Sequence, residues 1–416
     1  MKKRLPLTCL ILLGVLSFAN LTVSAENTLL AKQAEAISKT AEALLLLPDH
    51  PHERNRNREL ATVVEFLIDS HDLERAQSFR AKITNWRADQ LKAKIATAYY
   101  ESGKKDLAEK MIKEVSVVAD TVTGWKAGMI AATGEHKNYF DKYDDFRLDR
   151  IKVALAEYCW ISGDKEAAKK WSENVLPAEQ SDFIKKQALA LAEADYDASL
   201  AINMILAEGE TFEGKKAAVD GVVLLYGLYF KDAEKRDHLK SLIDRYSISM
   251  PIMYRVEWLH DMALAADENG DAELARSFYH EASLFISQSE FRPRLFFPLK
   301  ASNIITAHKL QFEDEALEAA KLLYKTYGES EGSIYNIHRA DVLCSIGEVF
   351  AFIGKMDRAE QVYLNALDQA VVNPNSKPRL EDLNLITLSL VEYDVPLTPS
   401  LNEEMNGLIK SLGTPW

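Results

Sequence analysis

The residue pair whose spacing best suits chemistry is Glu257 and His260, in the run Glu257-Trp258-Leu259-His260-Asp261. Side chains three residues apart share one face of a helix. A Glu-x-x-His pair can bind a metal ion in a helical bundle, but such sites need carboxylates from matching motifs on other helices. This sequence contains no second Glu-x-x-His motif. We therefore expect Glu257 and His260 to form part of a polar face and not a metal site.

Motifs of the common catalytic classes are missing from the sequence. We find no HExxH motif, EF-hand loop or Gly-rich phosphate loop, and we expect no nucleophile elbow because no strand-rich segment is evident. His50 and His52 lie in a polar segment with two prolines, residues 48–58, which we expect to be a solvated loop. Cys159 and Cys344 lack disulfide or zinc spacing and are expected to be buried free thiols. The sequence thus predicts no cofactor, no metal and no catalytic site.

The elements that would position any site are best seen in residues 339–370, which predict two short amphipathic helices. The first helix has apolar or small residues at i, i+3, i+4 and i+7, namely Leu343, Ile346, Gly347 and Phe350. Gly354 supplies a tight turn, and Asp357 is placed to cap the second helix. The second stripe follows the same spacing, with Ala359, Val362, Tyr363, Ala366 and Ala370. In such an antiparallel hairpin the small residues Gly347 and Ala359 let the two backbones approach closely.

This spacing of small and aromatic residues resembles the tetratricopeptide repeat. The resemblance is carried by five residues, namely Gly347, Gly354, Ala359, Tyr363 and Ala366. The Trp of the family's first helix is replaced here by Leu343, and the helix-ending Pro is not in place. The resemblance implies an all-α, right-handed α-solenoid of about eight to nine antiparallel hairpins, in which the first helix of each hairpin lines a concave groove.

Weaker copies of this unit recur along the chain. We predict turns at nine positions, namely His71, Gly103, Gly134, Gly163, Tyr196, Lys231, Gly270, Gln311 and Gly354. Their spacing starts near the tetratricopeptide period of about 34 residues and lengthens toward the C-terminus. The predicted organisation is a signal peptide (1–25), an N-terminal capping helix and loop (26–56), a repeat array (57–372) and C-terminal capping helices (373–416).

The N-terminus has the pattern of a secretory signal. Three basic residues precede an apolar run from Leu7 to Phe18, and Val23-Ser24-Ala25 is a small-residue cleavage site. The full chain has a net charge of −13, which becomes −16 without the basic leader. Such a charge disfavours nucleic acid and anionic lipid as partners. We therefore expect a periplasmic or secreted protein without a membrane segment after cleavage behind Ala25.

Candidate binding residues follow from matching the first helices of the better repeats turn to turn. The positions expected to face the groove are Arg58, Glu65, Gln90, Thr97, Tyr100, Arg150, Glu157, Trp160, Glu257, His260, Asp341 and Glu348. Trp160 and Tyr100 are the strongest of these, because aromatic residues dominate binding energy at interfaces.

Three functions remain open at this point. The first hypothesis is an exported, non-catalytic repeat protein that binds a protein or peptide in its groove. The alternatives are an envelope assembly scaffold and a carbohydrate-active helical toroid, although no acid pair can be placed for the latter. A closed ring would favour the toroid, whereas an open superhelix would favour the groove.

Overall fold

The computed structural model describes residues 31–133, 145–173 and 175–412, and these form nineteen α-helices, one 3-10 helix and no strand. The expected signal peptide and the predicted turn at Gly134 lie outside the described residues. None of the described helices combines the length and apolarity needed to cross a bilayer. The fold is an all-α solenoid of nine hairpins preceded by one further helix, α2 (Ala31–Leu44).

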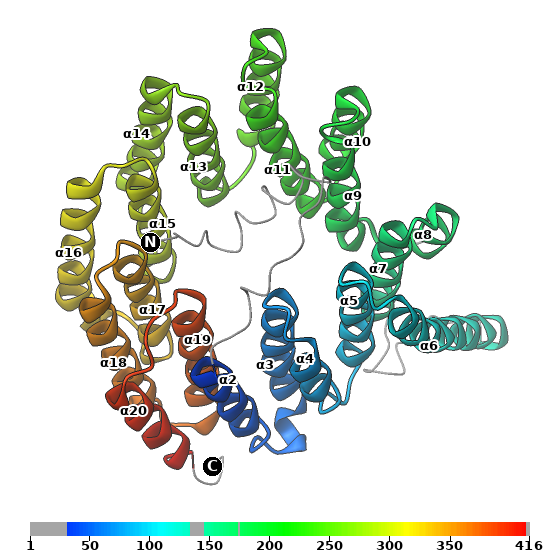
Figure 1. Cartoon of the computed structure of the whole chain (residues 1–416), viewed down its shortest axis with the longest axis horizontal. Coiled ribbons are helices and arrows are strands. Elements are labelled where there is room, and N and C mark those ends of the chain that lie inside the picture. The colour runs from blue at the N-terminus through cyan, green and yellow to red at the C-terminus, as the bar shows by residue number, and fades with distance from the viewer. Residues whose placement is uncertain (1–30, 134–144, 174, 413–416) are drawn as a thin grey trace.

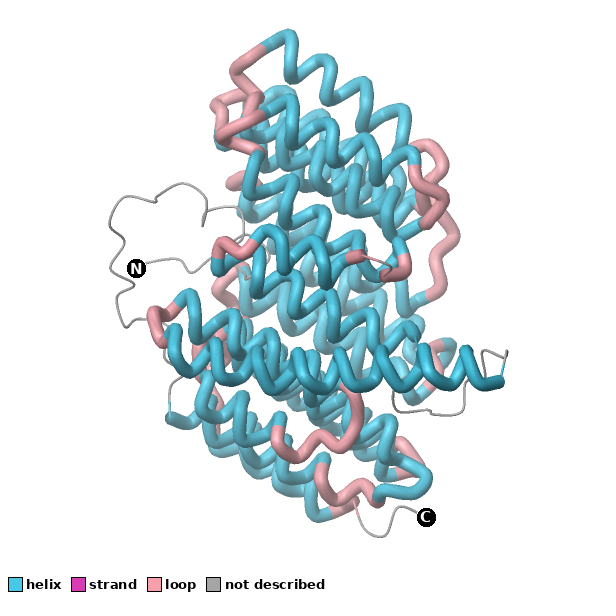
Figure 2. Tube along the Cα trace, turned by 90° about the vertical axis from the view of Figure 1, so that its right-hand side faces the viewer, coloured by secondary structure: helices cyan, strands magenta, loops and turns pink. Residues whose placement is uncertain are grey.

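The nine hairpins stand side by side with one helix inside and one outside (Figure 1). The inner helices are α3 (Asp49–Asp69), α5 (Arg87–Glu101), α7 (Asp145–Ser162), α9 (Pro177–Leu191), α11 (Phe212–Leu228), α13 (Ile252–Glu268), α15 (Pro293–Lys309), α17 (Asn336–Phe352) and α19 (Ser376–Glu392). Their outer partners are α4 (Leu73–Arg80), α6 (Lys105–Thr133), α8 (Lys165–Ser172), α10 (Tyr196–Glu208), α12 (Ala233–Ser247), α14 (Ala272–Gln288), α16 (Glu313–Ser330), α18 (Met356–Val372) and α20 (Pro399–Lys410). The 3-10 helix η1 (Glu331–Ser333) follows α16. Seen from the side, loops collect along two rims and α6 extends beyond one of them (Figure 2).

The array closes into a ring, because the last inner helix packs against the first elements of the chain. Helix α19 contacts both α2 and α3, which lie beside it in Figure 1. The hydroxyl oxygens of Thr40 and Thr387 lie 2.9 Å apart, and Asn384 Nδ2 donates to Thr62 Oγ1 at 3.0 Å. We call this contact of α19 with α2 and α3 the seam.

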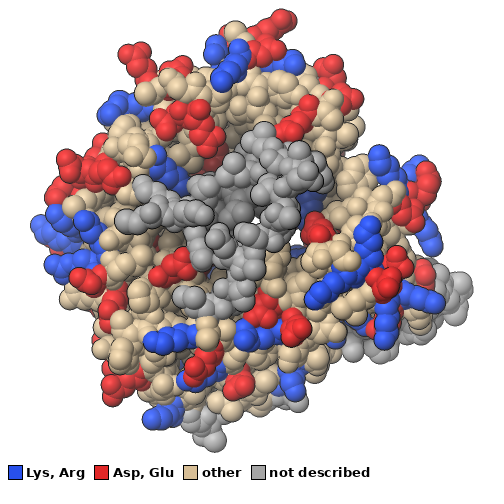
Figure 3. All heavy atoms as spheres, viewed as in Figure 1, with Lys and Arg blue, Asp and Glu red and all other residues tan. Residues whose placement is uncertain are grey.

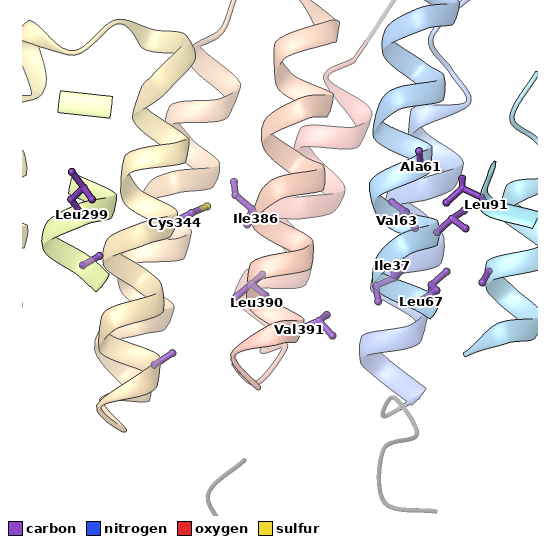
Figure 4. Packing of buried hydrophobic residues seen from close by; sticks show 14 of the residues in the cluster. Ile37, Ala61, Val63, Leu67, Leu91, Leu299, Cys344, Ile386, Leu390 and Val391 are labelled. Atoms are coloured by element: carbon purple, nitrogen blue, oxygen red, sulfur yellow. The ribbon is translucent and has the colours of Figure 1, made fainter. Parts of the chain in front are cut away.

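Apolar packing continues through the seam. Figure 4 shows Val391 of α19 opposite Ile37 of α2, with Leu67 of α3 nearby. These three side chains are fully or almost fully buried, and they belong to one core cluster that follows the whole ring. Both ends of the array are therefore covered by each other, and α19 and α20 pack against α18 as the ninth hairpin.

The turn chemistry of the array is largely as predicted. Six of the nine predicted turn positions have a left-handed backbone, namely His71, Gly103, Gly163, Gly270, Gln311 and Gly354. Tyr196 and Lys231 do not, and Tyr196 instead begins α10 behind the capping residue Asp195. Asp357 is also not a cap, because Lys355 holds that position and Asp357 lies in the first turn of α18.

Close approach of the two helices of each hairpin depends on small residues. Ala108, Ala168, Ala275 and Ala359 are all buried. A Cβ atom added to Gly347 would lie 2.8 Å from Cε2 of Tyr363, so only glycine fits opposite that ring. The prediction that small side chains at these places allow the helices to nest is confirmed.

The segment expected to be a loop, residues 48–58, is helical. Pro48 is the N-cap residue of α3, and Pro51 lies in the first turn, where a missing backbone N–H costs no hydrogen bond. Asn57 is fully buried and donates from Nδ2 to Thr84 Oγ1 at 3.0 Å. His52 is buried as well, so the expectation of a solvated loop is wrong.

Candidate functional site

Charged side chains on consecutive inner helices meet in ion pairs, which we call the wall pairs. Lys94 Nζ of α5 lies 2.6 Å from Glu65 Oε1 of α3. Further wall pairs join α7 to α9, α9 to α11 and α15 to α17, namely Arg150–Glu179, Lys186–Glu157, Lys185–Asp220 and Arg294–Asp341. A pair of this kind contributes about 0–1 kcal/mol because water reaches it. The wall pairs therefore align the inner helices more than they stabilise the ring.

Five of the twelve residues predicted to face a groove take part in ion pairs between inner helices. Arg58 donates to Glu381 of α19 at 2.6 Å across the seam. Those found in ion pairs between inner helices are Arg58, Glu65, Arg150, Glu157 and Asp341. Both signs of charge are also interspersed over the end of the ring that is visible in Figure 3. No large patch of one sign is visible on that end.

The two aromatic residues favoured as binding anchors are half-buried between hairpins. Tyr100 donates to the backbone oxygen of Ser162 at 3.4 Å and packs edge-on against Tyr158 with centroids 5.7 Å apart. Trp160 packs against the core, with Lys165 Nζ 5.2 Å from its ring centroid. Both rings thus already serve the packing of α5, α7 and their neighbours, which reduces the surface they can offer a partner.

One of the two polar residues predicted beside those rings has a local partner. Gln90 and Thr97 of α5 are half-buried. The Thr97 hydroxyl donates to the backbone oxygen of Ala93 at 3.2 Å. The Thr97 hydroxyl is therefore already bonded within its own helix.

His260 does not face the interior of the ring. It is 4% exposed and lies between α13 and α15, where its Nε2 is 3.0 Å from Oδ1 of Asn303. Its Nδ1 is 3.2 Å from Oγ of Ser302. Burial lowers its pKa to about 4, so the imidazole is neutral at pH 7. The prediction of His260 as a groove residue is therefore wrong, and its partner Glu257 points to a different, exposed face.

Asp220 on α11 is the best-connected carboxylate of the inner helices. Its Oδ2 lies 2.7 Å from Lys185 Nζ and 3.0 Å from Lys216 Nζ, and its Oδ1 accepts a hydrogen bond from Trp258 Nε1 at 2.7 Å. Burial alone would raise the pKa of Asp220, but these donors outweigh burial and hold the pKa below its usual value. No sequence motif marks Asp220, because its partners come from three different helices.

Asp261 on α13 behaves in the opposite way. Enclosure by the surrounding protein, with Asp220 as the next largest cause, raises its pKa to about 6. The side chain remains exposed to water, so we expect a smaller rise than full burial would give. Enclosure also raises the pKa of Glu257, one turn earlier. Two neighbouring inner helices thus carry carboxyl groups with oppositely shifted pKa values.

Glu348 on α17 belongs to a second polar cluster. Its Oε1 accepts a hydrogen bond from Ser389 Oγ at 2.8 Å. The same Ser389 Oγ lies 2.7 Å from the hydroxyl oxygen of Tyr363. Burial raises the pKa of Glu348 to about 7, and Glu392 and Asp341 add to the rise. This cluster connects the wall to the hairpin core.

Residues 328–332 have the spacing G-x-S-x-G, which the motif search in the sequence missed. Ser330 ends α16, and its hydroxyl donates to the backbone oxygen of Thr326 at 2.7 Å. A nucleophile elbow requires a strand before the serine. A helix precedes Ser330, so the motif match carries no catalytic meaning.

The described inner helices therefore present paired charges and isolated carboxyl groups. The described residues contain no group of three or more His, Cys, Asp or Glu placed to hold a metal ion. Such a wall can bind a ligand by exchanging internal ion pairs for external ones.

No protein-family model matches the chain, and no curated protein matches it. Among solved structures the chain is similar to one described as a "Circular tandem repeat protein with novel repeat topology and enhanced subunit contact surfaces". The two are 15% identical, and the alignment covers 91% of this chain and 96% of the other. The TM-score is 0.29, which is too low to support any inference from that structure.

Proposed function

We propose that this chain is an exported, tetratricopeptide-like ring that binds an extended segment of a partner protein against its inner wall without catalysis. The observation that supports the proposal is the series of wall pairs. They place accessible charges of both signs on neighbouring inner helices, as at Lys94–Glu65 and Lys186–Glu157.

An extended polypeptide suits such a wall for a physical reason. A peptide carries its charges at intervals, and each one can replace an internal partner at little cost because an exposed pair is weak. Repeat arrays commonly use their concave face in this way. Apart from residues 134–144, which lie outside the described part of the chain, the connections between hairpins are short and leave few loops to build an enclosed active site.

The test uses an array of charged 15-residue peptides, probed with the protein and with Glu65→Gln/Glu157→Gln. This double substitution leaves Lys94 and Lys186 without their wall partners. The matched control is Asp244→Asn/Glu318→Gln, which removes the acidic partners of Lys240 and Lys321 on the outer helices α12 and α16.

We expect a subset of peptides to bind the protein and the control equally and to change affinity by fivefold or more in the wall variant. Circular dichroism checks that all three proteins fold alike. If no peptide binds, or if the wall variant binds the same peptides equally well, the inner wall is not a peptide site.

Glycan hydrolysis is the second candidate function, favoured by ring closure and by the opposite pKa shifts of Asp220 and Asp261. Two carboxyl groups whose pKa values are shifted apart are a feature that acid–base hydrolysis uses. Against it, Asp220 is already bound by Lys185, Lys216 and Trp258. Turnover of any glycan in a screen, lost in Asp261→Asn, would establish this candidate over the first.

A further inference from the structure

Five arginines lie on three successive inner helices, and two of them pack against the ring of one tryptophan, Trp86. Arg54 and Arg58 are four residues apart on α3, Arg87 begins α5, and Arg147 and Arg150 are three apart on α7. Helix α5 contacts both α3 and α7, which places Arg87 between the two other pairs. We call these five residues the arginine cluster.

Trp86 fixes the centre of the cluster. Its ring is buried at 3% exposure, and the guanidinium carbon of Arg87 lies 4.6 Å from the ring centroid. The guanidinium carbon of Arg150 lies 5.6 Å from the same centroid. Two guanidinium groups on one ring are each attracted by its π-electrons, yet they repel each other. A tryptophan placed in this way holds like charges together.

Charge repulsion acts on Arg87 at the centre of the cluster. Burial lowers the pKa of Arg87, and the next four causes are all arginines, namely Arg150, Arg54, Arg147 and Arg58. At the edges of the cluster, Glu59 and Glu381 lie on Arg58, and Glu179 lies on Arg150. Within the described part of the chain, the guanidinium groups of Arg54 and Arg87 make no ion pair.

We propose that the arginine cluster binds a phosphate group. Two guanidinium charges, at Arg54 and Arg87, lack a carboxylate among the described residues, and a phosphate carries about −1.5 to −2 charges near pH 7. A single carboxylate would neutralise only one of them. Guanidinium groups also donate paired N–H bonds that match phosphate oxygens. The beginnings of α5 and α7 add the positive end of the helix dipole.

Inorganic phosphate is the probe, because the same chemistry serves a free phosphate and a phosphate ester. Titration calorimetry with the full chain compares phosphate, acetate and glycerol 3-phosphate at equal ionic strength. The test variant is Arg54→Gln/Arg87→Gln. The control is Arg245→Gln/Arg358→Gln, which removes two exposed arginines from the outer helices α12 and α18.

We expect saturable phosphate binding below 1 mM, weakened tenfold or more in the test variant and unchanged in the control. Tighter binding of glycerol 3-phosphate would identify an ester as the source, and equal binding would identify free phosphate. Acetate binding as tight as phosphate binding would overturn the assignment of phosphate. Absence of saturation by 10 mM, or full affinity in the test variant, would overturn the site. The site does not depend on peptide binding to the wall pairs, because none of the substituted residues belongs to a wall pair.

Discussion

Replacing Asp382 with asparagine should make the ring more stable above neutral pH. Asp382 is 6% exposed on α19, and its Oδ2 accepts a hydrogen bond from Nδ2 of Asn373 at 2.6 Å. Asn373 is fully buried, and its Oδ1 has no partner among the described atoms. Burial, Glu381 and Asp341 together raise the pKa of Asp382 to about 8.

The sign of the effect follows from proton linkage. An aspartate carboxyl in water has a pKa of 3.8, so between about pH 4 and pH 8 the folded protein holds a proton on Asp382 that the unfolded chain has released. Stability contributed by this group is complete below pH 4 and is lost as pH rises to 8. A pKa difference of about four corresponds to at most about 6 kcal/mol, at 1.4 kcal/mol per pH unit, and relaxation of the site reduces this to about 2–3 kcal/mol.

The assay is urea unfolding followed by circular dichroism between pH 4.5 and pH 8.5. Asp382→Asn keeps the shape, stays neutral and can pair with both polar atoms of Asn373. We expect the variant to exceed the parent by about 2–3 kcal/mol at pH 8 and to match it near pH 4.5. The control is Asp314→Asn on the exposed surface of α16. A variant with the same pH slope as the parent, or one less stable at pH 8, would refute the reasoning.

Three further outcomes are expected. Gln311→Gly should stabilise the protein by about 1 kcal/mol in urea unfolding. Gln311 has a φ of 65°, a left-handed conformation that is unfavourable for a residue with a side chain but not for glycine. A loss of stability in this variant would contradict the expectation. Gly347→Ala should destabilise it by about 1–3 kcal/mol, since the added Cβ meets the ring of Tyr363 at 2.8 Å, and an unchanged unfolding midpoint would count against the close packing. Cys159 and Cys344 should react with a thiol reagent at pH 8 only after the protein unfolds. Burial raises the pKa of both thiols, to about 11 for Cys159, so little reactive thiolate forms in the folded protein. Rapid labelling of the folded protein would contradict this expectation.

Sequence pattern was informative wherever a local rule decides the structure. Glycine at Gly103, Gly163, Gly270 and Gly354 marks the left-handed turn residue, and small residues such as Ala359 mark the close contact within a hairpin. These positions depend on neighbours within one repeat. The α-solenoid could therefore be predicted from single units.

Ring closure could not be predicted in this way. It depends on the rotation between successive hairpins, added up over nine units, and no local pattern records that sum. Its direct contacts, such as Thr40 with Thr387, join residues 347 apart in sequence. Closure brings α19 against α2 and α3, so each end of the array is covered by the other.

The candidate site could be predicted only in part. Helical spacing placed Glu65 and Glu157 on the inner helices, where they form wall pairs. The same reasoning failed for His260, because a polar side chain on an inner helix can also turn toward a neighbouring helix and find Asn303. The arginine cluster could not be predicted, because its side chains come from separate helices and no pattern in a single sequence shows that these helices lie together.

Closure of the ring is the central claim, and a designed disulfide across the seam tests it most directly. Thr40→Cys/Thr387→Cys places two thiols where hydroxyl oxygens now lie 2.9 Å apart. The single substitutions serve as controls, since the native thiols at Cys159 and Cys344 are buried. We predict nearly complete intramolecular disulfide formation under mild oxidation, seen as a gel-mobility shift reversed by reductant and mapped by mass spectrometry. An open array would leave the two cysteines apart, and a monomer without this disulfide would contradict the closed ring.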